Sequence, residues 1–130
     1  MTAHDTTAYE TAVARYFEAW NVEGAENAEN IDKAVAAAWT EDGSYTDPLA
    51  DVSGHEGIAA VIKGAHEQFP GFEFRRTGAV DGHHDIARFT WELVSPADGS
   101  APVAGSDVIT LADDGRIRTV HGFLDRVPTA

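Results

Sequence analysis

The residues in this sequence best suited to chemistry are one tyrosine and two aspartates, Tyr16, Asp47 and Asp107. A phenol can donate a hydrogen bond to a substrate oxygen, and a carboxylate can accept a proton from a substrate carbon. A carboxyl group that burial keeps neutral can also donate a hydrogen bond. If these three side chains meet in one pocket, they can perform acid-base chemistry without a metal or a cofactor.

Tyr16 belongs to a run of apolar residues whose spacing predicts a helix over residues 7–20. Trp20 lies one turn later on the same face, so the pattern buries the phenol ring. A buried phenol hydroxyl usually has a hydrogen-bond partner. Two interpretations stay open, because that partner is either a substrate oxygen or a backbone carbonyl of the core.

The two aspartates also have a structural and a catalytic interpretation. Asp107 alternates with apolar residues along a predicted strand, so its carboxyl group pairs with a cation, takes up a proton or faces water. Asp47 precedes Pro48 at the end of a short extended segment, where an aspartate often accepts hydrogen bonds from the backbone of its own turn. The end of an element also permits Asp47 to project into an open pocket as a base.

Three amphipathic helices are predicted in the first part of the chain, and the first covers residues 7–20. The third begins after Ser53, which has the spacing of a capping box with Glu56, and it ends at Pro70-Gly71. The second helix is expected to bury one face that consists of Ile31, Val35, Ala38 and Trp39.

After Gly71 the pattern changes to short segments rich in β-branched and aromatic residues, separated by turn signals such as Asp81-Gly82. Short turns join antiparallel neighbours. Helices followed by a strand meander indicate an α+β domain, in which three N-terminal helices pack on a curved, mainly antiparallel sheet. We expect one domain over residues 1–130. The strands are predicted at residues 72–80, 84–95, 103–112 and 116–127.

The composition narrows the range of partners. A formal net charge of −13 repels phosphate, which argues against nucleic acid and anionic membrane surfaces. The chain has no cysteine, so thiolate catalysis and cysteine-bound metals are excluded. No apolar stretch is long enough to span a bilayer, and the first residues carry no secretory signal, so a cytoplasmic location is expected.

The histidines do not predict a metal site. His83 and His84 lie beside Asp81 and Asp85, but adjacent residues on a strand point to opposite faces. The Asp81-Gly82 pair moreover indicates a turn at this place. We therefore predict no metal and no cofactor.

The three candidate positions resemble those of the nuclear transport factor 2-like superfamily, and within it those of Δ5-3-ketosteroid isomerases and SnoaL-like polyketide cyclases. Arg15-Tyr16 is similar to the helical Arg-Tyr pair that supplies an oxyanion-hole tyrosine in the isomerases. Thr46-Asp47-Pro48, followed by Gly54, resembles the segment of the proton-shuttling aspartate. Asp107, before Gly115-Arg116-Ile117, has the spacing of the second oxyanion donor.

This resemblance implies a cone-shaped domain that binds a small hydrophobic carbonyl compound, and it also implies a homodimer. Asp47 would move a proton between carbons, while Tyr16 and a protonated Asp107 would donate hydrogen bonds to the enolate oxygen. Ile62 stands where the isomerases have a tyrosine that supports the catalytic one. The residues expected to contact the substrate are Trp20, Trp39, Val61, Phe69, Trp91, Val120 and Leu124.

Three kinds of function are compatible with these observations. The first is a cofactor-free isomerase or cyclase that uses general acid-base catalysis. The second is a module of the same fold that binds a small hydrophobic molecule without reaction. The third is a dimerising scaffold domain. Dependence of phenolate binding on Tyr16 and Asp107 separates the first from the others.

Overall fold

A computed structural model describes residues 6–22 and 28–128, in which the chain forms three helices and six strands. His4 and part of the predicted connection between the first two helices lie outside the described residues. The helices are α1 (Thr6–Trp20), α2 (Ala28–Ala38) and α3 (Gly54–Gln68). The strands are β1 (Trp39–Asp47), β2 (Ala50–Ser53), β3 (Glu73–His83), β4 (Ile86–Val94), β5 (Val103–Leu111) and β6 (Ile117–Arg126).

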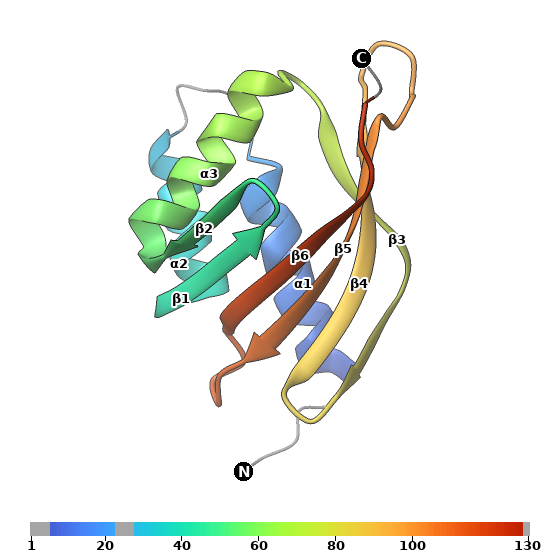
Figure 1. The fold of residues 1–130 in the computed structure, drawn as a ribbon. Helices are drawn as coiled ribbons and strands as arrows, with labels where there is room; N and C mark the ends of the chain where they lie inside the picture. The colour runs from blue at the N-terminus through green and yellow to red at the C-terminus, as the bar shows by residue number, and fades with distance from the viewer. Residues whose placement is uncertain (1–5, 23–27, 129–130) are drawn as a thin grey trace.

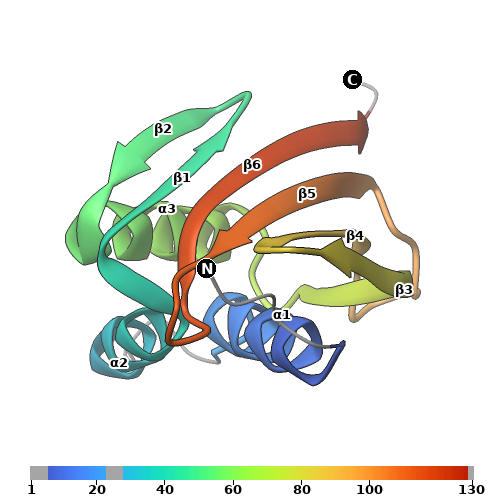
Figure 2. The same ribbon diagram turned by 90° about the horizontal axis from the view of Figure 1, so that it is seen from below.

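The strands form one open, mixed sheet in the order β2-β1-β6-β5-β4-β3. β1 runs parallel to β6, and every other neighbouring pair is antiparallel. The three helices pack against the sheet, and its long strands curve over them (Figure 1 and Figure 2). The α+β class and the mainly antiparallel sheet are therefore confirmed. None of the described helices is long and apolar enough to cross a membrane.

The predicted helices are confirmed, with two corrections at their ends. Trp39 does not belong to the second helix but begins β1, where it pairs with Ile117 of β6, because sheet pairing can bury this side chain completely. Ser53 precedes α3, but its side chain makes no capping hydrogen bond. Ser53 is the last residue of β2 and pairs with Ser44, so the sheet sets its backbone conformation.

The turn predicted at Asp81-Gly82 is wrong, because β3 continues through both residues and Gly82 pairs with Ala87. The reversal comes later, at His84, whose φ is 51°. A Cβ atom at position 82 would lie 2.8 Å from ring carbons of Tyr9. This glycine therefore permits a close approach between strand and helix, which is the other common reason for a glycine inside a strand.

The central strand β5 buries alternate residues on its helix-facing side, as its pattern predicts. At position 105 on this face, a Cβ would lie only 2.4 Å from Cζ2 of Trp91. Gly105 thus leaves space for the indole ring of β4, next to Asp107 on the same face of β5. The buried residues of the strand are Val103, Gly105, Asp107, Ile109 and Leu111.

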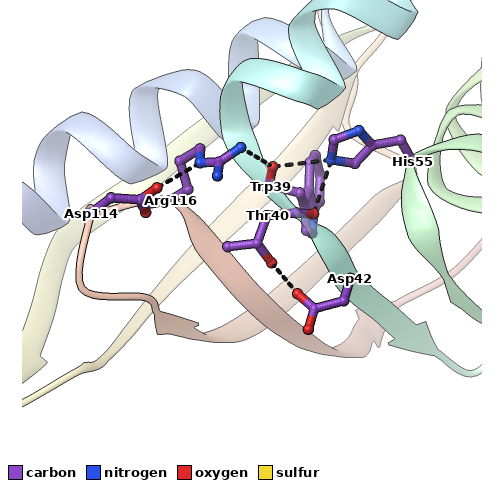
Figure 3. A network of polar contacts seen from close by, with 6 residues as sticks. All are labelled: Trp39, Thr40, Asp42, His55, Asp114 and Arg116. Carbon is purple, nitrogen blue, oxygen red and sulfur yellow. Dashed lines mark hydrogen bonds and ion pairs between the residues drawn. The ribbon is translucent and has the colours of Figure 1, made fainter.

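A polar network fixes the start of β1 (Figure 3). His55 Nε2 lies 3.1 Å from the carbonyl oxygen of Trp39 and 2.9 Å from that of Thr40. Because a carbonyl only accepts, Nε2 must be the protonated nitrogen. Arg116 also donates to the Trp39 carbonyl at 3.3 Å, and its guanidinium pairs with Asp114. His55 of α3 and Arg116 of the turn before β6 therefore hold together the junction between α2 and β1.

We expect His55→Ala to lower the free energy of unfolding by about 1 kcal/mol, because the Thr40 carbonyl loses its side-chain donor. Urea denaturation at pH 7 measures this change. The matched control is His121→Ala, since His121 is exposed on β6 and makes no hydrogen bond through its side chain within the described part of the chain. Equal stabilities of the two variants would contradict a structural role for His55.

Candidate active site

A pocket of about 540 Å3 is lined by residues from α1, α3 and all six strands. This volume lies within the range of small-molecule sites, and most of the lining side chains are apolar. Its polar lining residues include Tyr16, Tyr45 and Asp47. Six aromatic residues contribute to the wall: Tyr16, Trp20, Tyr45, Phe69, Phe74 and Trp91.

The residues predicted to contact a substrate divide into two groups. Trp39 and Val120 have no exposed surface and belong to the core, so they do not line the pocket. Both are completely enclosed because β1 and β6 pair side by side beneath the helices. The predicted residues that do line the pocket are Trp20, Val61, Phe69, Trp91 and Leu124.

Tyr16 and Asp107 form a hydrogen-bonded pair at the inner end of this pocket. The Tyr16 hydroxyl donates to Oδ2 of Asp107 at 2.6 Å, a length typical of a phenol bound to a carboxylate. Both side chains are buried, with 4% and 2% of their surface exposed. Tyr16 lines the pocket whereas Asp107 does not, so the tyrosine lies between the carboxyl group and the cavity.

Burial controls the protonation of this pair. Burial, and next the negative charge of Asp107, raise the pKa of Tyr16 well above its usual value, so its hydroxyl stays a donor at neutral pH. Burial also raises the pKa of Asp107 to about 6, although the hydrogen bond from Tyr16 opposes this shift. The direction agrees with the neutral Asp107 that the resemblance implies. However, a pKa of about 6 leaves most of this group ionised at pH 7.

A second phenol-carboxylate pair, Tyr45 and Asp47, lies on β1 at the wall of the same pocket. The Tyr45 hydroxyl donates to Oδ2 of Asp47 at 2.6 Å. Burial, and next this hydrogen bond, raise the pKa of Tyr45 strongly, so it too remains neutral. Tyr45 is not among the site residues predicted from the sequence. The spacing could have indicated it, because Tyr45 and Asp47 are two residues apart on one strand and therefore share a face.

Asp47 also performs the turn role that its sequence context predicts. Its Oδ1 accepts the backbone N–H groups of Leu49 at 2.8 Å and Ala50 at 2.9 Å. With the bond from Tyr45, three donors point at this carboxylate. A carboxylate offers about four acceptor positions, so about one remains for a ligand. The structural and the catalytic interpretations of Asp47 are therefore compatible.

Gly122 brings the two carboxyl groups close together. A Cβ at this position would lie 2.7 Å from Oδ1 of Asp107 and 3.4 Å from Cβ of Asp47. Gly122 pairs directly with Asp107 across β5 and β6, so the absent side chain provides the space that the carboxyl group occupies. The negative charge of Asp47 contributes to the raised pKa of Asp107. The two candidate acids are therefore neighbours, as a shared site requires.

Two indole groups border the Tyr16-Asp107 pair without a hydrogen bond of their own. Nε1 of Trp20 and Nε1 of Trp91 are buried and have no partner among the described residues. Trp91 nevertheless lies close enough to Asp107 to oppose the rise of its pKa, and Trp20 does the same for Tyr16. Both side chains therefore stabilise negative charge on the pair.

The described residues contain no group of three or more His, Asp or Glu side chains that could hold a metal ion. His83 and His84 contact each other through their Nδ1 atoms, 3.1 Å apart, and both are exposed.

Comparison with known proteins identifies the family to which this fold and sequence are similar. Residues 13–120 match the model of the SnoaL-like domain. A crystal structure of a proposed isomerase of the SnoaL-like family from Agrobacterium tumefaciens is 43% identical, with a TM-score of 0.84, and the match covers 92% of this chain and 98% of that one. No curated protein gives a significant match.

More distant structures share the fold. A proposed SnoaL-like polyketide cyclase from Jannaschia is 23% identical with a TM-score of 0.70, over 92% of this chain and 86% of that one. A proposed polyketide cyclase from Sinorhizobium meliloti is 21% identical with a TM-score of 0.65, over 92% and 99%. Given the family model and the relative at 43% identity, the chain belongs to the SnoaL-like domain family, which has the nuclear transport factor 2-like fold.

Proposed function

We propose that the protein is a cofactor-free enzyme that uses general acid-base catalysis on a small hydrophobic carbonyl compound, as an isomerase or a polyketide cyclase. The observation that carries the proposal is the buried Tyr16-Asp107 hydrogen bond at the inner end of an apolar pocket whose wall also holds Asp47. The names of related proteins, an isomerase and polyketide cyclases, support the same chemistry.

In this proposal Tyr16 contacts the substrate and Asp107 acts through it. The substrate carbonyl oxygen accepts the Tyr16 hydroxyl hydrogen, which in the free protein is donated to Asp107. In the molecules whose Asp107 is protonated, a fraction that grows as pH falls toward its pKa of about 6, this carboxyl group donates to the Tyr16 oxygen, so that the phenol becomes a stronger donor. Negative charge that develops on the carbonyl oxygen is thereby stabilised by a donor that is already in place. Asp107 is thus a positioning residue, and Tyr16 is the catalytic one.

Asp47 is the proposed base. It takes a proton from the carbon next to the carbonyl, and the electron pair of that C–H bond moves toward the carbonyl oxygen to give an enolate. Return of the proton to a different carbon completes an isomerisation. Attack of the enolate carbon on a second carbonyl forms a C–C bond instead, and the proton then neutralises the new alkoxide. Protons and charge balance in both routes without a cofactor.

Binding of a phenolate, which imitates the enolate, tests this proposal. The probe is a naphthol with electron-withdrawing groups that keep it ionised at pH 7, followed by its fluorescence. We expect Tyr16→Phe to weaken binding by about tenfold or more, because a hydrogen bond to a charged oxygen is lost. We expect Asp47→Asn to strengthen binding by about tenfold, because the amide removes a like charge and imitates the protonated base.

The matched control is Asp51→Asn, which changes the net charge equally on β2 but does not line the pocket. Phenolate affinity that is unchanged in Tyr16→Phe would refute the catalytic proposal. Affinity that depends on Tyr16, without any proton exchange in bound ketones, would instead identify a binding module of the same fold.

A further inference from the structure

The carboxyl groups of the pocket have no cationic partner. The ion pairs among the described residues join other carboxylates to lysines and arginines on the surface, and neither Asp47 nor Asp107 takes part in one. The side chains that donate to these two carboxyl groups are neutral phenols. A buried charge is stabilised by hydrogen bonds or by an opposite charge, and within the described residues these two carboxyl groups have only hydrogen bonds. A ligand with a positive charge would add an interaction that the described residues do not supply.

The wall of the pocket also contains no positive charge. No lysine, arginine or histidine is present among its described lining residues. An anionic ligand would meet the carboxylate of Asp47 and no counter-charge, in a chain whose formal net charge is −13. The same field attracts a cation and raises its local concentration. The electrostatics of the site thus disfavour substrates that carry carboxylate or phosphate groups.

Aromatic rings follow one another along the wall, starting beside Asp47. Tyr45, whose hydroxyl is bound to Asp47, has its ring centroid 5.6 Å from that of Trp20. Trp20 lies 4.9 Å from Phe74, which in turn lies 5.2 Å from Trp91. The faces of such rings attract organic ammonium ions, and aromatic cages with a nearby carboxylate are a general device for binding them.

We infer that this pocket selects hydrophobic ligands that carry a protonated or quaternary amine, with the ammonium group beside Asp47 and the adjoining aromatic rings. Asp47 is the contacting carboxylate because it lines the pocket, whereas Asp107 lies behind Tyr16. The inference concerns recognition and does not depend on the proposed reaction.

A pair of ligands with the same shape and different charge tests this inference. The two probes are 2-naphthyltrimethylammonium, whose charge does not vary with pH, and its neutral isostere 2-tert-butylnaphthalene. We expect the wild-type protein to bind the ammonium compound about tenfold more tightly than the isostere, since a desolvated cation gains from both the rings and the carboxylate. Equal affinities would overturn the inference without any variant.

The variant Asp47→Asn then locates the ammonium group. The amide can still accept the backbone N–H groups of Leu49 and Ala50 that the carboxylate accepts, so the turn is kept. We expect the preference for the ammonium compound to fall about tenfold in Asp47→Asn and to stay within about twofold in the control Asp51→Asn. A preference that persists in Asp47→Asn would refute the assignment.

The same variant keeps this inference separable from the proposed function. Asp47→Asn is expected to strengthen phenolate binding and to weaken ammonium binding, so the two ligand classes respond in opposite directions. Suppose that phenolate affinity is the same in the wild type and in Tyr16→Phe, while the preference for the ammonium compound is present. This result would refute the proposed enzyme and support the amine site. Phenolate affinity that falls in Tyr16→Phe, without any preference for the ammonium compound, would refute the amine site and leave the proposed enzyme supported.

Discussion

Tyr16→Phe is expected to slow hydrogen-deuterium exchange next to the carbonyl of a bound hydrophobic ketone by about 10²- to 10³-fold. This loss is typical when one donor to a developing oxyanion is removed. The Tyr16 hydroxyl lies at the pocket wall and holds its proton at neutral pH, because burial raises its pKa. Phenylalanine keeps the ring and its packing but leaves the enolate oxygen without this donor. Mass spectrometry of a ketone incubated in D2O measures the rate.

Tyr9→Phe is the matched control for this experiment. Tyr9 is also buried on α1 and donates its hydroxyl to the His84 carbonyl at 2.8 Å, but it does not line the pocket. We expect its exchange rate to equal that of the wild type. If hydrogen-deuterium exchange of the ketone slowed equally in Tyr9→Phe and Tyr16→Phe, the cause would be a general loss of folded protein. An unchanged rate in Tyr16→Phe would exclude the tyrosine as the oxyanion donor.

Asp107→Asn is expected to change how the free energy of unfolding depends on pH, by about 2 kcal/mol between pH 4 and pH 7. Burial raises the pKa of Asp107 from 3.8 to about 6, so the folded protein keeps this proton in a range where the unfolded chain releases it. Folding therefore takes up a proton, and the contribution of Asp107 to stability falls as pH rises from about 4 to about 6. The amide has no proton to take up.

The free energy of unfolding, measured with urea at several pH values, checks this result. The free energy of unfolding of Asp107→Asn, minus that of the wild type, should be about 2 kcal/mol larger at pH 7 than at pH 4. Asp113→Asn serves as the control, because it removes one carboxylate at an exposed position of the turn before β6. If the curves of wild type and Asp107→Asn stay parallel between pH 4 and pH 7, the pKa of Asp107 is not raised.

The position of each candidate residue on its own element was predictable. Helical spacing placed Tyr16 on the buried face of α1, and strand alternation placed Asp107 among buried residues of β5. The proline after Asp47 marked the end of a strand, and the structure has β1 end there. Each of these features depends on a few neighbouring residues, because backbone periodicity and turn preferences are local.

Other features depended on residues far apart in the chain. The Asp81-Gly82 pair predicted a turn, but Gly82 lies within β3 and leaves space for the ring of Tyr9 of α1. Trp39 and Val120 were predicted to contact the substrate, yet the parallel pairing of β1 with β6 encloses both in the core. A single sequence carries no local mark for such a pairing, since its register is set by how whole strands pack.

By itself, the sequence determined three helices, a strand meander and the place of each candidate residue on its element: Tyr16 on a buried helix face, Asp107 among apolar strand residues and Asp47 at a strand end. These follow from apolar spacing and from the proline after Asp47. Only the tertiary structure decided that Tyr16 donates a hydrogen bond to Asp107, 91 residues away in the chain, and that Tyr16 lines the pocket whereas Asp107 does not. The absent side chain of Gly122 brings Asp47 and Asp107 together. Tyr45 joins Tyr16, Asp47 and Asp107 as a fourth member of the candidate site, because it donates to Asp47 and lines the same pocket. Strand register and packing set the distances between these side chains.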